Sequence, residues 1–546
     1  KDGIHGATFS SESLHEGSPA SAVQIGDPIT QKKMHDAQIE ARDQGLYNSV
    51  TDNGAGGLSS SVGEMARECG GVEVELDSVP IKYAGLLPCE IWISESQERM
   101  SYAVPPENLD RFMAIMKRHD VEATVIGKFT DSGRCRVTLH GKPVLDLDLE
   151  FMHEGLPRAE LKSAWEPPAL AEPKLAPRDN YSADLVAMMG RLNLCSREYV
   201  VRQYDHEVQA GSVVKPLVGV GQDVHQDATV VQPLYDQPEG VALASALHPW
   251  YGDLEPAAMA EAGIDSAVRA VVAVGADPDR VAVLDNFCWC SSTEPFRLAQ
   301  LKRAGLACYQ TATEFSVPFI SGKDSMFNDF KGFDGEDNPV KVSVPPTLLI
   351  SSIAVVPDVK KCVTLDPKAV GDLVYVLGVT RDELGGSEYY AYRGETEEGE
   401  RYVGARVPRI SDVRALRERY QKLGAAIARG LLASCCPVGV GGLAATLARM
   451  VMAGECGLAL DLSGLPRESH LDDGKVLFSE SLGRLAITVA PKKRSAFESV
   501  LAGEPFDLLG RVTASGRLQV TGVSGKQVID VGFAELKESY KKTLGW

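Results

Sequence analysis

The sequence predicts a mixed α/β (α+β) fold that contains a tandem repeat, and three observations support this prediction. Similar segments recur at a nearly constant distance along the chain, and segments with helical and strand periodicity alternate. The composition, with 44% hydrophobic and 24% charged residues, is typical of a folded globular protein. A length of 546 residues corresponds to three or four domains at about 150 residues each.

Four segments in the first part of the chain recur in the same order near the end. Residues 54–58 (GAGGL) recur as 439–443 (GVGGL), and residues 94–100 recur as 479–485, both at a shift of 385. Residues 68–70 and 126–130 recur as 455–457 and 509–513, with shifts that differ from 385 by two residues. The constant order indicates an internal duplication.

The repeat divides the chain into four parts. We expect the first copy at 1–160, a proline-rich linker at 161–177, a middle subdomain at 178–365 and the second copy at 366–546. The middle subdomain has no counterpart in the sequence. If one repeat unit contains both kinds of subdomain, the first unit is expected to lack a leading subdomain of roughly two hundred residues.

Local patterns predict the individual elements. In the first copy they favour a strand at 72–76, a helix at 109–118 and a strand at 121–129. In the middle subdomain they favour a helix at 255–274, a strand at 280–284 and a helix at 294–304. The uncharged stretch 430–448 is long enough for a membrane span, but Pro437 and three nearby glycines favour a turn followed by a buried helix.

Charge and cysteine content limit the possible functions. Acidic residues outnumber basic ones by 75 to 56, which opposes binding to nucleic acid or to an anionic membrane. ATP is still allowed, because Mg²⁺ can bridge carboxylates to phosphates. The 11 cysteines lack C-x-x-C spacing and no signal peptide is visible, so we expect reduced thiols and a cytoplasmic protein.

A glycine-rich loop at residues 50–58 (VTDNGAGGL) precedes a predicted helix at 59–68. Its glycines would let backbone amides approach an oxyanion, and Asp52 could hold Mg²⁺ beside it. The alternative is a tight turn in which Asp52 caps the helix.

A cluster of polar side chains follows Ile93, where we expect a strand to end. Glu95, Ser96 and Gln97 are suited to orienting a polyhydroxylated or amide-bearing substrate. A solvated strand end would have the same composition.

A third polar cluster follows an apolar segment at residues 318–320. Gly322 would allow close approach of a phosphate, Lys323 would supply charge, Asp324 could bind metal and Ser325 could donate a hydrogen bond. The segment lacks the first glycine of a Walker A motif, so a simple turn is the alternative. Asp285 follows the predicted strand at 280–284, a common ligand position in α/β proteins.

Taken together, these segments resemble phosphoribosylformylglycinamidine synthase of purine biosynthesis, a ligase family. The strongest matches are 2–9, 23–28, the Asp52 loop, 94–100, 275–286 and 322–326. The resemblance implies a tandem pseudo-repeat like aminoimidazole ribonucleotide synthetase, incomplete here: two C-terminal-type α/β subdomains and only the second ATP-binding α+β subdomain. It also implies ATP-dependent conversion of formylglycinamide ribonucleotide to the amidine, with ammonia from a glutaminase domain or subunit.

The resemblance also implies roles for individual residues. Gln24, Glu95, Ser96, Gln97 and Ser325 would contact the substrate; Asp285, Gly322 and Lys323 would contact the nucleotide; and Asp52, Asp227 and Asp265 would hold Mg²⁺. Asp227 and Asp265 match an auxiliary nucleotide site found in some branches. Pro437 and Val440 replace carboxylates of relatives in the second copy, which argues against that site.

The family's catalytic histidine lies in the subdomain that we expect to be missing. We therefore expect no catalytic residue in this chain and no synthase activity from the chain alone. The alternative hypothesis is a noncatalytic scaffold that docks a glutaminase or a partner subunit.

Overall fold

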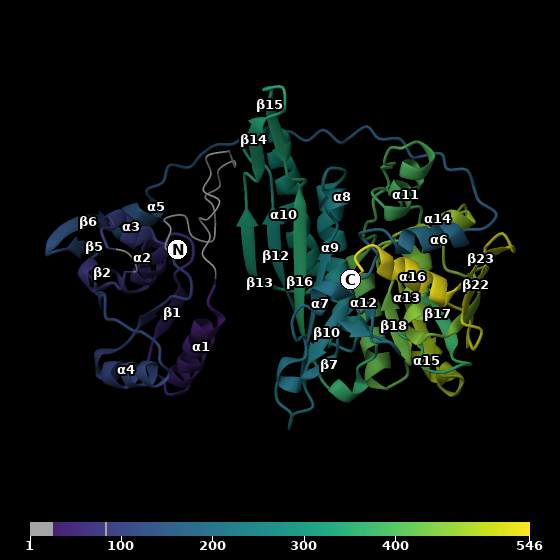
Figure 1. The fold of residues 1–546 in the computed structure, drawn as a ribbon, viewed down its shortest axis with the longest axis horizontal. Helices are drawn as coiled ribbons and strands as arrows, with labels where there is room; N and C mark the ends of the chain where they lie inside the picture. The colour runs from purple at the N-terminus through teal and green to yellow at the C-terminus, as the bar shows by residue number, and fades with distance from the viewer. Residues whose placement is uncertain (1–25, 82–83, 546) are drawn as a thin grey trace. The chain divides into compact units, whose positions relative to one another are not determined.

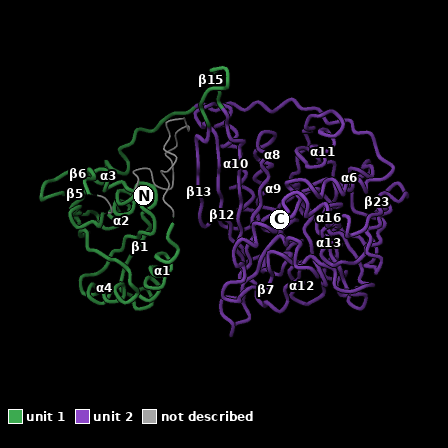
Figure 2. Tube along the Cα trace, in the orientation of Figure 1, with its two compact units in different colours: residues 1–161, 330–341 green, residues 162–329, 342–546 purple. Residues whose placement is uncertain are grey.

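The structure is a computed structural model that describes residues 26–81 and 84–545. It contains two compact units (Figure 2): residues 1–161 with 330–341, and residues 162–329 with 342–546. Gln24 and residues 2–9 lie outside the described residues. The finer boundary predicted at residues 365 and 366 stays a prediction.

The first unit contains the first copy of the repeat (Figure 1). Strands β1 and β3 form one sheet, and a second sheet has the order β4-β2-β5-β6. The elements are α1 (Pro28–Asp43), β1 (Ser49–Asp52), α2 (Gly57–Cys69), β2 (Val72–Glu75), α3 (Pro88–Ile93), β3 (Met100–Ala103), α4 (Leu109–Arg118), β4 (Gly127–Phe129), β5 (Arg134–Leu139), β6 (Lys142–Asp148) and α5 (Leu149–Glu154).

The middle of the chain builds a six-stranded sheet in the second unit. Its order is β13-β12-β16-β11-β10-β7, with β12 and β13 parallel. The elements of this part of the chain are α6 (Ser182–Met189), α7 (Glu198–Val201), β7 (Ser212–Val214), β8 (Leu217–Val218), β9 (Val224–His225), β10 (Ala228–Val231), β11 (Gly240–Leu247), α8 (Pro249–Gly252), α9 (Pro256–Ala273), β12 (Val281–Cys288), α10 (Pro295–Phe315), β13 (Phe319–Ser325), β14 (Asp329–Phe333), β15 (Pro339–Ser343) and β16 (Thr347–Val356). Strands β8 and β9 form a separate two-stranded sheet, as do β14 and β15, whose residues 330–341 belong to the first unit.

The second copy of the repeat forms a seven-stranded sheet in the order β18-β20-β17-β21-β19-β22-β23. Its elements are β17 (Leu373–Leu377), α11 (Glu388–Glu397), α12 (Val413–Ala428), β18 (Ser434–Pro437), α13 (Gly442–Gly454), β19 (Gly457–Asp461), α14 (Asp473–Phe478), β20 (Leu485–Val489), α15 (Arg494–Val500), β21 (Phe506–Thr513), β22 (Arg517–Thr521), β23 (Gln527–Gly532) and α16 (Phe533–Lys542).

The two copies have the same element order and the same strand pairing. The run α1 to α5 of the first copy matches the run α12 to α16 of the second, with six strands in equivalent places. The pair β1-β3 corresponds to β18-β20, and β4-β2-β5-β6 corresponds to β21-β19-β22-β23. In the second copy β17 joins these two groups into one sheet, whereas no described strand does so in the first copy. The duplication predicted from the sequence is therefore confirmed.

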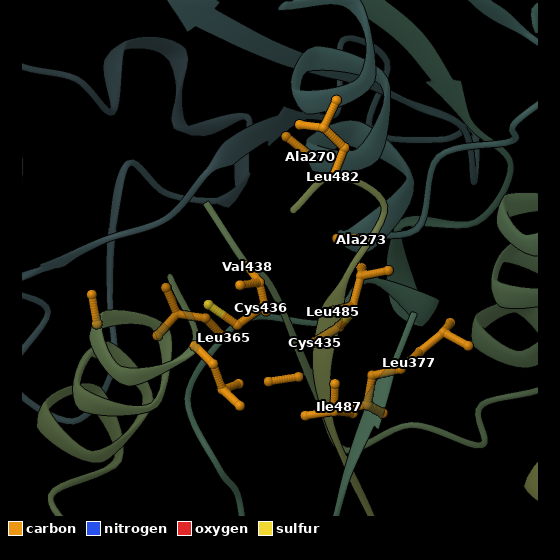
Figure 3. Close-up of a cluster of buried hydrophobic side chains, with 14 of the residues drawn as sticks. Ala270, Ala273, Leu365, Leu377, Cys435, Cys436, Val438, Leu482, Leu485 and Ile487 are labelled. Atoms are coloured by element: carbon orange, nitrogen blue, oxygen red, sulfur yellow. The ribbon is translucent and has the colours of Figure 1, made fainter. Parts of the chain in front are cut away.

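Helix α9 packs between the sheet of the middle subdomain and the second copy. It is buried along nearly its whole length, and it is rich in alanine and valine, which permits close packing on both sides. Figure 3 shows Ala270 and Ala273 of α9 in one cluster with side chains of β17, β18 and β20, among them Leu377, Cys436 and Ile487. The middle subdomain and the second copy thus share one hydrophobic core.

The proline-rich segment is extended and ordered along the second unit. Trp165 stacks on Phe296 at a centroid distance of 5.4 Å, and Glu172 accepts hydrogen bonds from the amides of Ala405 and Arg406 at 2.8 and 2.7 Å. The ring of Trp165 also lies 4.8 Å from the guanidinium of Arg303. Proline favours the extended backbone, and these contacts fix its course.

Several element predictions need correction. The strand predicted at 121–129 begins only at Gly127, and no strand ends at Ile93, because residues 88–93 form helix α3. Pro88 suits a first helical turn, and the Glu90 carboxylate accepts a hydrogen bond from the amide of Leu87. The stretch 430–448 forms a short strand, a glycine turn and the buried start of α13, which confirms the preferred prediction.

Candidate functional site

The glycine-rich loop of the first copy connects β1 to α2 in the backbone conformation that its glycines permit. Gly56 and Gly57 have φ values of +81° and +56°, in the left-handed region that favours glycine. A Cβ atom at Gly57 would lie 2.0 Å from the carbonyl oxygen of Ser94. Glycine is therefore required for the loop to pass this close to the segment after α3.

A carboxylate of that segment caps the loop. Glu95 Oε1 accepts a hydrogen bond from the amide of Gly56 at 3.1 Å. In the second copy Glu480 Oε1 accepts a hydrogen bond from the amide of Gly441 at 2.9 Å. Glu480 and Gly441 lie 385 positions after Glu95 and Gly56 in the sequence. The repeat thus extends to individual hydrogen bonds, and the two loops can be compared atom by atom.

An arginine that the sequence reasoning missed fixes the segment after α3. The Arg99 side chain donates a hydrogen bond to the carbonyl oxygen of Ser94, and its Nε donates to that of Ser96 at 3.0 Å. The second copy repeats these bonds with Arg484, Ser479 and Ser481. An arginine occupies the same position in residues 94–100 and 479–485. This recurrence is the sequence signal that would have identified Arg99.

Asp52 lies at the end of β1 and is exposed to solvent. Its Oδ1 accepts a hydrogen bond from the amide of Gly54 at 2.8 Å, which orients the carboxylate over the loop. One such carboxylate fits Mg²⁺, which commonly uses one or two protein carboxylates together with phosphate oxygens and water. Within 26–81 and 84–545, no group of three or more His, Cys, Asp or Glu side chains could hold a metal ion.

The equivalent site of the second copy is closed by other side chains. Glu480 is only 5% exposed and accepts further hydrogen bonds from the Tyr251 hydroxyl at 2.9 Å and the amide of Glu388 at 3.2 Å. Burial raises the pKa of Glu480 to about 7, although these donors oppose the shift. Pro437 stands where the first copy has Asp52, so this loop lacks both the exposed carboxylate and the space around it.

We expect the buried carboxyl of Glu480 to make stability depend on pH. A carboxyl whose pKa is raised on folding stabilises the protein at low pH, and this contribution is lost as the pH rises. The free energy of unfolding should fall between the unfolded pKa of about 4.5 and the folded pKa of about 7. Urea unfolding across this range should show a flatter pH dependence for Glu480→Gln. An unchanged slope would contradict the assignment.

The second set of candidate residues lies within β12 and β13 of the second unit. Asp285 is paired with Gly322 across the two parallel strands, and a Cβ at Gly322 would lie 2.5 Å from Asp285 Oδ1. Burial, and then the nearby Asp324 carboxylate, raise the pKa of Asp285. The sequence predicted that Asp285 and Gly322 would each follow the end of a strand, but each lies inside its strand.

The side chains of this set project from opposite faces of the sheet. Asp285 pairs with Ile350, which contacts α9 at Gly263, so Asp285 and Gly322 belong to the face covered by helices. Side chains alternate along a strand, so Lys323 and Ser325 belong to the other face. There Lys323 Nζ donates a hydrogen bond to Ser325 Oγ at 2.5 Å. The structure therefore separates Asp285 from Lys323.

The structure does not support Asp227 and Asp265 as Mg²⁺ ligands. Asp227 forms two hydrogen bonds with the Arg449 guanidinium, at 3.0 and 2.9 Å. Asp265 is fully buried, 3.3 Å from an Arg269 nitrogen, and accepts a hydrogen bond from the Tyr420 hydroxyl. Carboxylates already neutralised by arginine do not provide an open cation site.

The comparisons with known proteins agree with the repeat. The family model for the C-terminal domain of AIR synthase related proteins matches residues 1–140 and 369–523. The PurL subunit of phosphoribosylformylglycinamidine synthase from Methanocaldococcus jannaschii is 33% identical over 546 residues, which cover 99% of this chain and 71% of that protein. The chain belongs to the PurL family. The PurL subunit from Methanopyrus kandleri is also 33% identical, over all of this chain and 72% of its own length.

Solved PurL structures have the same fold. The structure titled T. maritima PurL complexed with FGAR matches 94% of this chain and 69% of its own, with a TM-score of 0.61 and 21% identity. The Thermotoga maritima PurLQS structure matches 92% of this chain and 70% of its own, with a TM-score of 0.58 and 19% identity.

No helix in the described part of this PurL-family chain is long and apolar enough to cross a membrane.

Proposed function

We propose that this PurL-family chain takes part in the ATP-dependent conversion of formylglycinamide ribonucleotide to formylglycinamidine ribonucleotide. ATP would phosphorylate the amide oxygen and leave as ADP, and ammonia would then displace phosphate to form the amidine. Phosphorylation makes the oxygen a good leaving group. The observation that carries the proposal is the first-copy loop, in which Glu95 caps Gly56 while the Asp52 carboxylate stays exposed.

The described residues have distinct roles in this proposal. Glu95, Ser96 and Gln97 orient the substrate, and Asp52 holds Mg²⁺, which neutralises charge on the transferred phosphoryl group. Asp285 and Gly322 contact the nucleotide from the helix-covered face of their sheet. Lys323 and Ser325, on the other face, place an ammonium and a hydroxyl side by side for anionic groups. Gln24, outside the described residues, is assigned to the substrate by motif alone.

The ammonia would come from a glutaminase partner in the cytoplasm. The Thermotoga maritima complex is named PurLQS, and we extend that kind of assembly to this chain by analogy with its fold. The net charge of −19 supports a role with small anionic substrates held through Mg²⁺ rather than with nucleic acid.

Gly322→Ala is expected to weaken MgATP binding about tenfold. The new methyl group would lie 2.5 Å from Asp285 Oδ1 and would displace the carboxylate that we assign to the nucleotide. Isothermal titration calorimetry with MgATP measures the change. Gly335→Ala is the matched control, because a Cβ there meets no atom within 4 Å. Equal affinities of both variants and the wild type would contradict the assignment.

An ammonia-dependent assay tests the reaction itself. Neither the structure nor the comparisons support the sequence-based expectation that the chain is inactive alone, so the assay uses the whole chain with MgATP, formylglycinamide ribonucleotide and ammonium. Formation of amidine and ADP in equal amounts supports the proposal. The scaffold alternative predicts glutaminase binding without affinity for MgATP or the ribonucleotide.

A further inference from the structure

A small buried polar network lies directly behind the Asp52 loop. The Asn53 side chain is 6% exposed, and its Oδ1 accepts hydrogen bonds from the hydroxyls of Ser61 in α2 and Ser101 in β3, the latter at 2.9 Å. The two hydroxyls are themselves 3.1 Å apart. The backbone amide of Asn53 donates to the carbonyl oxygen of Arg99 at 3.2 Å. The residue next to Asp52 is thus tied to a helix and to a neighbouring strand.

The second copy shows that the fold does not need this network. Val438 occupies the position of Asn53 and keeps the backbone bond, since its amide donates to the carbonyl oxygen of Arg484 at 2.9 Å. Ala486 replaces Ser101, and Thr446, which replaces Ser61, donates to the carbonyl oxygen of Gly442 in its own helix at 2.9 Å. The same strand–loop–helix unit is therefore built with apolar side chains at two of the three positions.

The network and the exposed carboxylate occur together. The first copy has Asp52 and the Asn53 network, whereas the second copy has Pro437 and Val438. Burying an amide and two hydroxyls costs desolvation free energy that apolar side chains avoid, and it gives directional bonds in return. A network that the fold does not require is explained by a need to fix the direction of the adjacent side chain.

We propose that Asn53 is a positioning residue that fixes the orientation of the Asp52 carboxylate. Its amide oxygen joins the end of β1 to α2 and β3, so the backbone at residues 52–54 cannot rotate and Asp52 Oδ1 stays on the amide of Gly54. This inference rests on the proposed function in one respect, because the proposed function assigns Asp52 to Mg²⁺.

The test uses Asn53→Val, which places in the first copy the residue that the second copy has. We expect an unfolding midpoint close to that of the wild type, faster hydrogen exchange at residues 52–57, and about tenfold weaker Mg²⁺ affinity in the presence of ATP. Ser60→Ala, on the exposed side of the same helix, is the control and should behave as the wild type. The triple variant N53V/S61A/S101A leaves none of these hydroxyls buried without a partner, so it should fold. It should still show the faster hydrogen exchange at residues 52–57 that we expect of Asn53→Val.

The outcomes separate this inference from the proposed function. A folded Asn53→Val protein with wild-type exchange at residues 52–57 overturns the positioning role, as does unfolding of the triple variant, which would make the network a requirement of the fold. If wild-type protein binds neither MgATP nor formylglycinamide ribonucleotide, the proposed function fails, and the exchange measurement still decides the role of Asn53.

Discussion

Asp52→Asn is expected to lower the affinity for Mg²⁺ in the presence of ATP about a hundredfold, and to lower ammonia-dependent turnover with it. The substitution keeps the size of the side chain and its ability to accept from the Gly54 amide. It removes the negative charge that a hard cation requires. Because Asp52 is exposed, loss of this charge should leave the free energy of unfolding nearly unchanged.

The measurement is a Mg²⁺ titration of nucleotide binding, followed by calorimetry or by turnover. Asp131→Asn makes the same charge change at another exposed position of the same unit and serves as the control. If Asp52→Asn and Asp131→Asn need the same Mg²⁺ concentration as the wild type, Asp52 is only a turn residue. That was the alternative left open by the sequence.

The repeat and the first-copy loop could be predicted from sequence because they are local. A run such as GAGGL fixes a backbone path by itself, through glycines that tolerate positive φ and a close approach to Ser94. The segments around Glu95 and Glu480 could be recognised from the sequence alone, because each is a copy of the other. The structure adds that the hydrogen bond from the loop amide to the glutamate is repeated as well as the residue types.

The faces and partners of the candidate residues could not be predicted in this way. The family resemblance assigned Asp285 and Lys323 to the same nucleotide, and only the strand boundaries and the pairing with β16 show that they project from opposite faces. Asp265 was assigned to metal by motif, but its partners Tyr420 and Gly483 are 155 and 218 residues away in sequence. Long-range packing of this kind leaves no local pattern.

Asp265→Ala is therefore expected to destabilise the protein by about 3–5 kcal/mol without changing MgATP affinity at the temperature where it remains folded. The carboxylate lies 3.3 Å from an Arg269 nitrogen and accepts from the Gly483 amide at 3.2 Å, all in the buried core. Its removal leaves the Arg269 guanidinium, which is 2% exposed, without its buried counter-charge. An unpaired buried charge is among the costliest defects in a protein.

Urea unfolding measures this loss, and Asp236→Ala, at an exposed position of the same unit, should stay within about 0.5 kcal/mol of the wild type. The two explanations of Asp265 predict opposite results. A structural role predicts lower stability with unchanged nucleotide binding, because the carboxylate then pairs with Arg269 and holds no metal ion. A metal role predicts weaker Mg²⁺-dependent nucleotide binding by the variant, because the cation would lose a carboxylate ligand. The close contact with Arg269 favours the first outcome.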